Sequence, residues 1–560
     1  MVFMDNDAIA ENFSLLGKLM DIHGENSFKT KSYTIAARTV DGLPRQLSEM
    51  SEPEIFSVKG FGDAIGKKIL EQLSSGRLPL LDKYIQQTPP GVIEMLNIKG
   101  LGPKKIATIW KDLEVETIGE LLYACNENRL LLYKGFGEKT QNNIRESIEF
   151  YLGNIGSYLY AQIAPYAELI VQQIQLQYPA YNTALTGNVA RHSEIITEIE
   201  LVTTIDAVEL YKYLASLGWQ EEEAFDNVTK YTTETGITVA FHHTNDERFY
   251  SLLFQTGSSE EFMQAFLKQV DFESNNHYAS EEDIFSENKL QFIPAYLRES
   301  EAVVIKAKEN KLPQVVEVSD IKGIIHSHST WSDGSNTIEE MVKAAIDMGF
   351  EYLILSDHSQ TAVYAEGLKP ERVAAQHKEI NELNKKYDPF RIFKSIESDI
   401  LNDGSLDYTA DVLSSFDLVI ASVHSNLKMS EEKAMQRLLT AIENPFTSIL
   451  GHMTGRLLLS RAGYPVDHKK IIEACAANDV VIELNAHPRR LDMDWRWINY
   501  AVEKNVLISI DPDAHTIKGF EDIRYGVLVA QKAGLTANNN LSSYSLRQME
   551  TFIEQQNKKR

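Results

Sequence analysis

The stretch KGIIHSHSTWSDG, residues 322–334, decides how the rest of this 560-residue chain is interpreted. A short apolar run leads into His326 and His328, and Asp333 follows on a predicted loop. Side-chain direction repeats every two residues along a strand, so a buried strand here places both imidazoles on one side. Imidazoles and a carboxylate that converge at a strand end are suitable ligands for zinc, manganese or iron. Taken alone, however, such a histidine pair is more often simply exposed.

The same pattern recurs through the C-terminal half. Apolar runs end in His358 (YLILSDHS), Glu397 (FRIFKSIESDI), His424 (DLVIASVHS), His452 (TSILGHMTG) and Asp513 with His515 (VLISIDPDAH), while VVIELNA carries Glu483 and Asn485. Segments with helical spacing and a glycine stop, such as TIEEMVKAAIDMG, lie between the runs. About seven strand–helix units, six with a ligand-type residue at the strand end, predict a barrel of parallel strands with its chemistry at the C-terminal face. Core histidines would explain one or two of these positions, but not six.

The motifs HSHS, SDHS, IESDI, ASVHS, LGHMTGR and DPDAH resemble the PHP domain of the polymerase and histidinol phosphatase family, over roughly residues 319–560. Their spelling is similar to that of bacterial PolX proteins. The resemblance implies a distorted seven-stranded βα barrel that holds three divalent metals, zinc or manganese. It implies one metal on His326, His328, Glu397 and Asp513, a second on bridging Glu397 with His424 and His452, and a third on Asp333, His358 and His515. Glu397, Asp513, His326 and His328 would serve catalysis by holding the metals that activate water.

Composition limits the class of protein. Hydrophobic residues make up 43% and charged residues 24%, which is ordinary for globular domains, and the length predicts several of them. The two cysteines, Cys125 and Cys475, do not make a disulfide framework, and the start of the chain lacks the pattern of a signal peptide. We therefore expect a cytoplasmic monomer without membrane spans. The net charge of −25 argues against indiscriminate nucleic-acid binding but permits a local basic surface.

A Lys-Gly-apolar-Gly turn occurs three times in the N-terminal part, which is predicted to be helical. The copies are VKGFGDAIGKK, IKGLGPKK and YKGFGEK. Two glycines permit a tight turn, and the free N–H groups of the following helix favour phosphate. The predicted DNA contacts are Gly60, Gly62, Lys67, Lys68, Gly100, Gly102, Lys104 and Lys105. The third copy, at Gly135 and Gly137, has the fewest lysines, and a purely structural role is its alternative.

These repeats resemble helix-hairpin-helix motifs, which grip nucleic-acid backbones without reading sequence. We place a lyase-like helical domain at residues 1–85 and a fingers-like region at 86–150. In the family's N-terminal domain a lysine after the first hairpin attacks the sugar of an abasic site, and Lys68 falls on that position. Lys68 is therefore a candidate Schiff-base nucleophile. A plain phosphate contact is the alternative role.

Residues 151–310 resemble the palm and thumb of a family X DNA polymerase, with departures at the catalytic positions. Gly187, Arg191 and the turn containing Gly257 and Ser258 match the family pattern. Glu198 and Glu200 replace two aspartates, and Ala240 replaces the third. Mg²⁺ tolerates little distortion of its octahedron, so we expect no magnesium at the palm and little or no polymerase activity. Alternatively, Glu198 and Glu200 are solvated strand charges.

The predicted fold class is multidomain, α+β and α/β: helix-hairpin-helix domains, a nucleotidyltransferase-like palm and thumb, and the barrel. Residues 303–310 are expected to include a strand, and residues 311–318 a linker. The expected function is metal-dependent 3′–5′ exonucleolytic hydrolysis in DNA repair, including base excision repair, on gapped, nicked or 3′-ended DNA of any sequence. An active gap-filling polymerase and a histidinol-phosphatase-like enzyme are the alternatives. Candidate phosphate ligands are Arg456, Arg461 and Arg490, for which surface ion pairs are the competing role.

Overall fold

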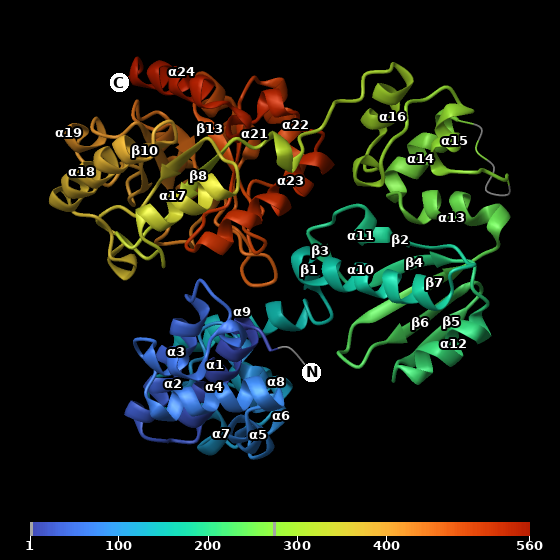
Figure 1. Ribbon diagram of the computed structural model, residues 1–560, viewed down its shortest axis with the longest axis horizontal. Coiled ribbons are helices and arrows are strands. Elements are labelled where there is room, and N and C mark those ends of the chain that lie inside the picture. Colours follow the sequence, from blue (N-terminus) through green and yellow to red (C-terminus); the bar gives the residue numbers. More distant parts are fainter. Residues whose placement is uncertain (1–3, 271, 273–275) are drawn as a thin grey trace. The chain divides into compact units, whose positions relative to one another are not determined.

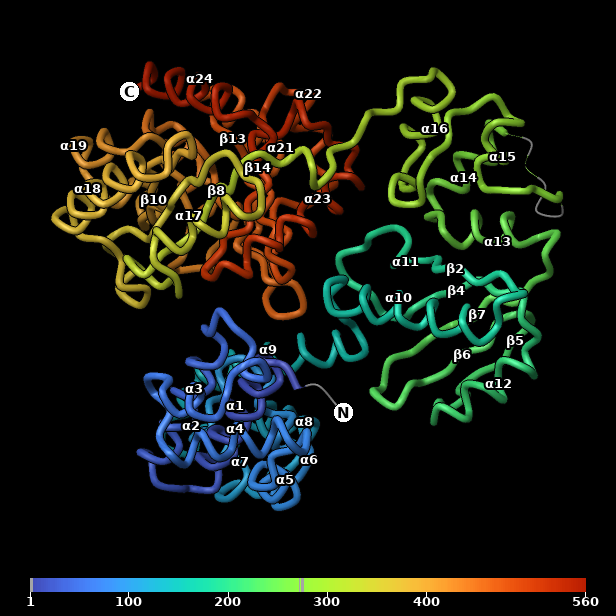
Figure 2. The backbone as a smooth tube through the Cα atoms, viewed as in Figure 1, coloured from blue at the N-terminus to red at the C-terminus, as the bar shows by residue number. Residues whose placement is uncertain are grey.

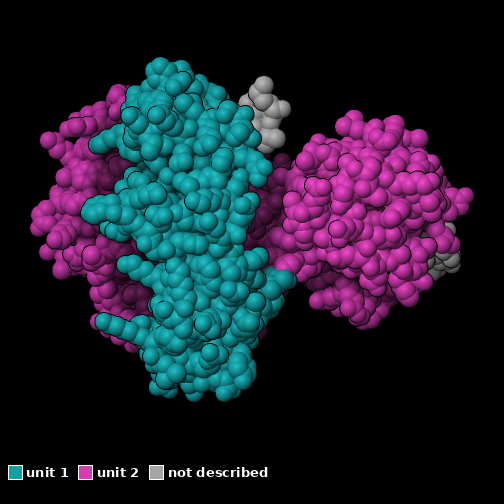
Figure 3. Space-filling model, turned by 90° about the horizontal axis from the view of Figure 1, so that it is seen from below, with its two compact units in different colours: residues 1–155 teal, residues 156–560 magenta. Residues whose placement is uncertain are grey.

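The computed structural model describes residues 4–270, 272 and 276–560. It falls into two compact units, residues 1–155 and 156–560, which Figure 3 colours teal and magenta. Among the described residues, no helix has the length and apolarity needed to cross a membrane. Cys125 and Cys475 are both buried and unpaired.

The first unit is helical, as predicted. Each Lys-Gly-apolar-Gly turn leads into a helix, and the first glycine of each turn has a positive φ: +102° at Gly60, +88° at Gly100 and +97° at Gly135. Side chains rarely adopt this conformation, which explains the glycines. The helices, shown in blue in Figure 1, are α1 Asn6–Ile22, α2 Ser27–Asp41, α3 Glu52–Ser57, α4 Asp63–Ser75, α5 Pro79–Gln86, α6 Pro90–Glu94, α7 Pro103–Lys111, α8 Ile118–Asn126 and α9 Glu138–Leu152.

The second unit begins with a five-stranded sheet in the order β2-β4-β7-β6-β5. Strands β4 and β7 run parallel, and their register places Glu200 opposite Ala240. On β4, Ile199 and Leu201 are buried in an apolar core, whereas Glu200 is only partly buried. The elements are β1 Tyr158–Leu159, α10 Tyr160–Gln177, β2 Thr183–Thr186, α11 Gly187–Ala190, β3 Ile195–Ile196, β4 Ile199–Thr203, α12 Ala207–Ser216, β5 Gln220–Phe225, β6 Val228–Thr232 and β7 Thr238–His243.

A phenylalanine-rich helical segment follows the five-stranded sheet. Its helices are α13 Phe249–Thr256, α14 Glu260–Gln269, α15 Glu281–Ser286 and α16 Glu301–Lys308. The guanidinium of Arg298 is buried over the rings of Phe254 and Phe285, at 5.0 and 5.4 Å, and pairs with Glu281 at 2.6 Å. A buried charge is tolerated when it is paired and hydrogen-bonded in this way.

The expectation of a strand after Ala302 was wrong, because helix α16 occupies most of that segment. Its first turn holds Glu301 and its last turn holds Lys306 and Lys308. This charge order complements the helix dipole. Val304 and Ala307 are buried three residues apart, which is helical spacing that the β-branched run obscured.

The remainder of the second unit is the predicted barrel. Its seven strands lie in the order β14-β13-β12-β11-β10-β9-β8, and every paired neighbour is parallel. The first and last strands approach each other through a parallel bridge between Ser327 and Ala514, so the barrel is nearly closed. The strands, traced in Figure 2, are β8 Gly323–Ser327, β9 Tyr352–Leu355, β10 Arg391–Asp399, β11 Leu418–Ser422, β12 Ile449–Leu450, β13 Val481–Asn485 and β14 Ile508–Asp511.

Helices cover the outside of the barrel and its N-terminal end. The outer helices, several of which are labelled in Figure 1, are α17 Ile338–Asp347, α18 Pro370–Lys386, α19 Ala410–Leu413, α20 Glu431–Ile442, α21 His468–Ala477, α22 Ile498–Glu503 and α23 Ile523–Lys532. Apolar side chains fill the layer between strands and helices. A second cluster inside the barrel includes Ile325, Phe393 and Phe552 of the last helix, α24 Leu546–Asn557. The C-terminal ends of the strands remain for the polar residues.

Candidate metal centre

All nine predicted ligands lie at the C-terminal ends of the barrel strands or on the loops that follow. His326 and Glu397 are within β8 and β10. The others come after strand ends, since parallel strands present the loops after them on one face. They are His328 and Asp333 after β8, His358 after β9, His424 after β11, His452 after β12, and Asp513 with His515 after β14.

Glu397 lies at the middle of the cluster and is 1% exposed. Its two carboxylate oxygens lie near five imidazoles: His452 at 3.0 Å, His424 at 3.1 Å and His326 at 3.3 Å from Oε1, and His358 at 3.0 Å and His328 at 3.7 Å from Oε2. Burial opposes ionisation, but the charge of His424 and His326 holds the pKa of Glu397 well below its usual value. The carboxylate is therefore ionised, which is the form that binds a metal.

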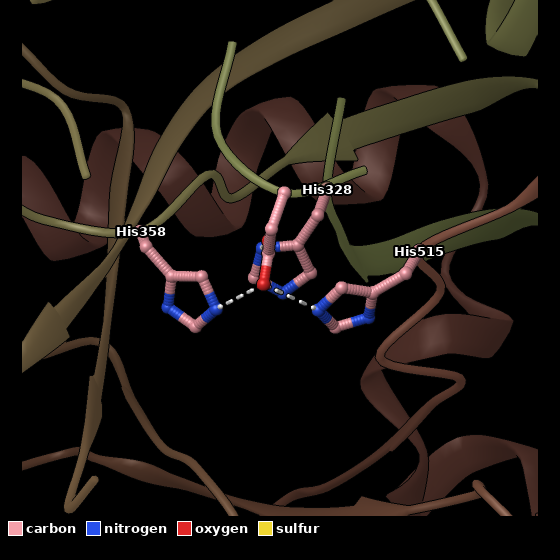
Figure 4. A group of neighbouring side chains, drawn as sticks. His328, His358 and His515 are labelled. Atoms are coloured by element: carbon pink, nitrogen blue, oxygen red, sulfur yellow. Dashed lines mark ion pairs between the residues drawn. The ribbon is translucent and has the colours of Figure 1, made fainter. Parts of the chain in front are cut away.

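A second group forms around Asp333. Its Oδ2 lies 3.6 Å from Nε2 of His358 and 3.5 Å from Nε2 of His515. Figure 4 shows these two imidazoles pointing toward one carboxylate oxygen, with His328 beside them. Burial, together with His515 and His358 nearby, lowers the pKa of His328 to about 3. The ring is thus neutral, as metal ligation requires.

Three ligands adopt left-handed backbone conformations: His326 at φ +59°, His452 at +21° and Asp513 at +52°. The pairing of β8 with β9 also shifts register between Ile324 and Ser327. His326 and His328 nevertheless lie on one side, as expected, with ring centres 5.3 Å apart and ligand-type atoms in one group. Because the register shifts and β8 ends at Ser327, an irregular backbone rather than plain strand alternation brings the two rings together. Such conformations cost free energy and cluster at functional sites.

The residues fit divalent metals. Nε2 of His326, Nδ1 of His328 and Oε2 of Glu397 are buried and have no hydrogen-bond partner among the described residues. Potential ligand atoms approach within 4.8 Å of one another in three groups: His328, Asp333, His358 and His515; His326, His328 and Asp513; and His358, Glu397 and His424. Imidazole nitrogens with carboxylate oxygens form a donor set typical of zinc, manganese and iron.

Two further carboxylates, which sequence reasoning did not assign, orient the histidines. Oδ1 of Asp399 lies 2.5 Å from Nδ1 of His424, and Oε2 of Glu483 lies 2.5 Å from Nδ1 of His326. A carboxylate on one ring nitrogen fixes the tautomer and leaves the other nitrogen for a metal. Asp399 follows Glu397 by two residues on the same strand, and side chains two residues apart point to the same side. This spacing could have indicated that Asp399 lies close to the ligands.

The three candidate arginines have different surroundings. The guanidinium of Arg456 contacts the carboxylates of Glu194 and Asp494 and the carbonyls of residues 490 and 491. Arg461 donates twice to the carbonyl of Gly455, at 3.0 and 2.7 Å. Arg490 alone approaches a predicted ligand, with Nε 3.4 Å from Oδ2 of Asp513. Of the three, Arg490 is therefore the one that contacts the ligand cluster.

In the helical unit, the second glycine of each hairpin is the N-cap of α4, α7 or α9. No side chain of the described residues caps these helices, so their first N–H groups are available to an anion. Gly62, Gly102 and Gly137 are exposed, and among the described residues no atom outside the adjoining backbone lies within 4 Å of the position that a Cβ would take. Lys67 and Lys104 are exposed nearby, while Nζ of Lys105 donates to the carbonyl of Gly100 at 3.0 Å.

Lys68 lies on α4 and lines an open cavity together with Lys67 and Glu71. Its assignment as a lyase nucleophile stays a prediction. The cavity contains two lysines and two glutamates, Glu52 being the second, so it presents no excess of positive charge.

Glu198, just before β4, and Glu200, within β4, each contact a side-chain nitrogen. Oε2 of Glu198 lies 2.7 Å from Nζ of Lys230, and Oε2 of Glu200 lies 3.1 Å from Nε2 of His242. The Glu200 side chain also fills the space over Gly187, whose added Cβ would lie 1.9 Å from Oε1. Arg191, from the same motif, contacts Glu299 at 3.4 Å. Gly257 is the C-cap of α13, and the hydroxyl of Ser258, the next residue, donates to the carbonyl of Phe254 at 2.6 Å.

Comparisons with known proteins agree with this architecture. Family profiles match a helix-hairpin-helix domain at residues 4–78, a SAM-like helix-hairpin-helix tandem at 92–149 and a PHP domain at 325–487. The chain is 32% identical to the DNA polymerase/3′-5′ exonuclease PolX of Bacillus subtilis (strain 168), over 96% of this chain and 97% of that protein. A probable phosphatase of Thermoanaerobacter sp. (strain X514) is 26% identical over 38% of this chain and 86% of its own length.

Replacing the Asp399 carboxylate should weaken metal binding, because His424 loses the negative charge that orients and polarises it. We expect Asp399→Asn to lower affinity for Mn²⁺ or Zn²⁺ by about tenfold or more. Calorimetric titration of the metal-free protein measures this. Asp403→Asn is the matched control, since Asp403 is exposed and its carboxylate accepts hydrogen bonds from Ser405, away from the histidines. Equal affinities for the Asp399→Asn variant and wild type would contradict the assigned role.

Proposed function

This chain belongs to the PolX family, and from that premise we propose that it is a DNA-binding repair protein that hydrolyses DNA phosphodiesters from the 3′ end. The observation that carries the proposal is the convergence of imidazoles and carboxylates at the C-terminal face of the PHP barrel. The matched phosphatase aligns with 38% of this chain, whereas this chain also carries three Lys-Gly-apolar-Gly turns, which lie within the helix-hairpin-helix matches. Such turns favour a nucleic acid over a small phosphate ester as the substrate.

We propose three divalent metals, zinc or manganese, at the site. Bound there, such metals activate water, neutralise phosphate oxygens and stabilise the leaving oxygen. His326, His328, Glu397 and Asp513 would hold one, Glu397 with His424 and His452 a second, and Asp333, His358 and His515 the third. Asp399 and Glu483 hold two of these imidazoles in one tautomer. Arg490 then contributes a planar, permanently charged guanidinium that suits a phosphate oxygen pair.

The other parts of the chain support this reaction. We assign DNA binding to residues 1–150, in agreement with the helix-hairpin-helix matches. Residues 151–310 form a palm and thumb without a workable magnesium site, because Ala240 supplies no ligand and Glu198 is held by Lys230. Their proposed role is structural support for the barrel at residues 319–560.

Removing two metal ligands tests where hydrolysis occurs. In His326→Ala/His328→Ala we expect Mn²⁺-dependent release of nucleotides from a 3′-ended strand to fall to the metal-free level, with DNA affinity unchanged. A 5′-labelled oligonucleotide on a sequencing gel and a binding titration give the two readouts. His468→Ala, which removes a histidine stacked on Trp497 outside the site, should degrade DNA normally. Undiminished degradation by the double variant would overturn the assignment.

Primer extension tests the palm. We expect no templated extension on a one-nucleotide gap, because two of the three carboxylate positions are paired and the third is alanine. The assay is best done in the His326→Ala/His328→Ala background, where degradation does not mask synthesis. Robust template-directed addition in Mg²⁺ would favour the gap-filling polymerase instead.

The lysines of the second hairpin test the DNA-binding surface. Lys104→Glu/Lys105→Glu should weaken binding equally on unrelated sequences, and the slope of log affinity against log salt should fall by roughly 2. Fluorescence anisotropy across a salt series measures both. Lys378→Glu/Lys385→Glu changes the net charge equally on exposed positions of α18 and should leave affinity unchanged. A loss confined to one sequence would contradict a phosphate contact.

A further inference from the structure

The barrel exposes few large apolar side chains, and the two most exposed are neighbours. Val363 is 82% exposed and Tyr364 is 70% exposed. Among the described residues of 319–560, the other exposed large hydrophobic side chains are Ile346 at 39% and Met348 at 43%. Val363 and Tyr364 lie on the short helix η7 Val363–Ala365, in the loop between β9 and α18. Apolar side chains held in water at the mouth of a site indicate a binding surface.

The loop that carries this pair is firmly anchored. Oγ1 of Thr361 donates to Asp399 at 2.7 Å and to Asp407 at 2.9 Å, and its N–H donates to Asp407 at 2.7 Å. Ala362 and Ala365 are buried on either side of the exposed pair. The exposure of Val363 and Tyr364 therefore does not come from a loose loop. A rigid surface loses little conformational entropy when a ligand covers it.

The same loop is tied to the metal centre. The Tyr364 ring lies 6.1 Å from the ring of His358, centre to centre. Asp399, which anchors Thr361, also holds Nδ1 of His424 at 2.5 Å. The loop that carries Tyr364 is thus held, through Thr361, by the carboxylate that orients a predicted metal ligand. A nucleotide whose phosphate occupied the metal centre would have its base within reach of this ring.

We propose that Tyr364, with Val363 beside it, is the stacking platform for the unpaired base of the 3′-terminal nucleotide. The inference rests on the proposed nuclease function and deepens it by assigning the residue that holds the terminal base. Every base has an aromatic face, so a platform of this kind tolerates all sequences. A base that remained paired and stacked in a duplex could not offer that face to Tyr364.

Substrates with and without a terminal base test the platform. One oligonucleotide ends in thymidine and its twin ends in a tetrahydrofuran abasic analogue. For Tyr364→Ala we expect the KM for the thymidine end to rise about tenfold or more, and the KM for the abasic end to stay within about twofold of wild type. Tyr364→Phe should retain the wild-type preference, and Val363→Ala should lose part of it. Met348→Ala removes an exposed apolar side chain elsewhere on the barrel and should change neither.

A binding measurement gives a second readout that does not depend on cleavage. The probe is a strand with 2-aminopurine at its 3′ end and a phosphorothioate at the last linkage, which slows hydrolysis. Wild-type enzyme should quench the fluorescence on stacking, and Tyr364→Ala should not. If Tyr364→Ala raised KM equally for the thymidine end and the abasic end, the role of the loop would be structural. If KM were unchanged for both ends, the exposed pair would fit a protein partner instead. Either result would overturn the inference. If wild type degraded neither end, the nuclease proposal would fail, while the quenching comparison would still judge stacking.

Discussion

Glu397 carries a negative charge at a position that is almost fully buried. The side chains at the C-terminal face of the barrel compensate for this buried charge. Five imidazoles on or after β8, β9, β11 and β12 surround its two oxygens. An isolated buried carboxylate would become protonated. Here the surrounding cations keep its pKa well below the usual value. Asp399 and Glu483 lie behind His424 and His326, where a carboxylate at Nδ1 leaves Nε2 of the ring for a metal.

Much of this arrangement was predictable from the sequence, because buried parallel strands are read as short apolar runs and ligands stand at their ends. All nine ligand positions follow from that rule together with the family motifs. The partners of the ligands did not follow, since the hydrogen bonds of Asp399 and Glu483 depend on which strands become neighbours. Backbone conformation was equally hidden: nothing in HSH reveals the positive φ of His326. Helix α16 was missed because its β-branched residues imitate a strand.

In the palm, the contacts of Glu198 and Glu200 supply information that the amino-acid substitutions alone did not. Sequence indicated that Ala240 removes a ligand, but it left Glu198 and Glu200 either as distorted ligands or as solvated charges. In the structure Glu198 pairs with Lys230 at 2.7 Å, and Glu200 contacts Nε2 of His242 at 3.1 Å. The longer Glu200 side chain also covers Gly187. Both carboxylates are thus engaged by side chains of the neighbouring strands.

Through the contacts of Arg456 and Lys532, the palm and thumb help to hold buried charges of the barrel. Arg456 contacts Glu194, and Lys532, which is 5% exposed, contacts Glu299 and the carbonyl of Arg191. Two cations of the barrel are therefore neutralised by acids that belong to the preceding sheet and helices. Deleting the palm and thumb would remove Glu299 from Lys532 and would leave Arg456 with Asp494 of the barrel. A segment can therefore be needed for the stability of its neighbour whatever chemistry it performs itself, since its removal would take partners away from buried charges of that neighbour.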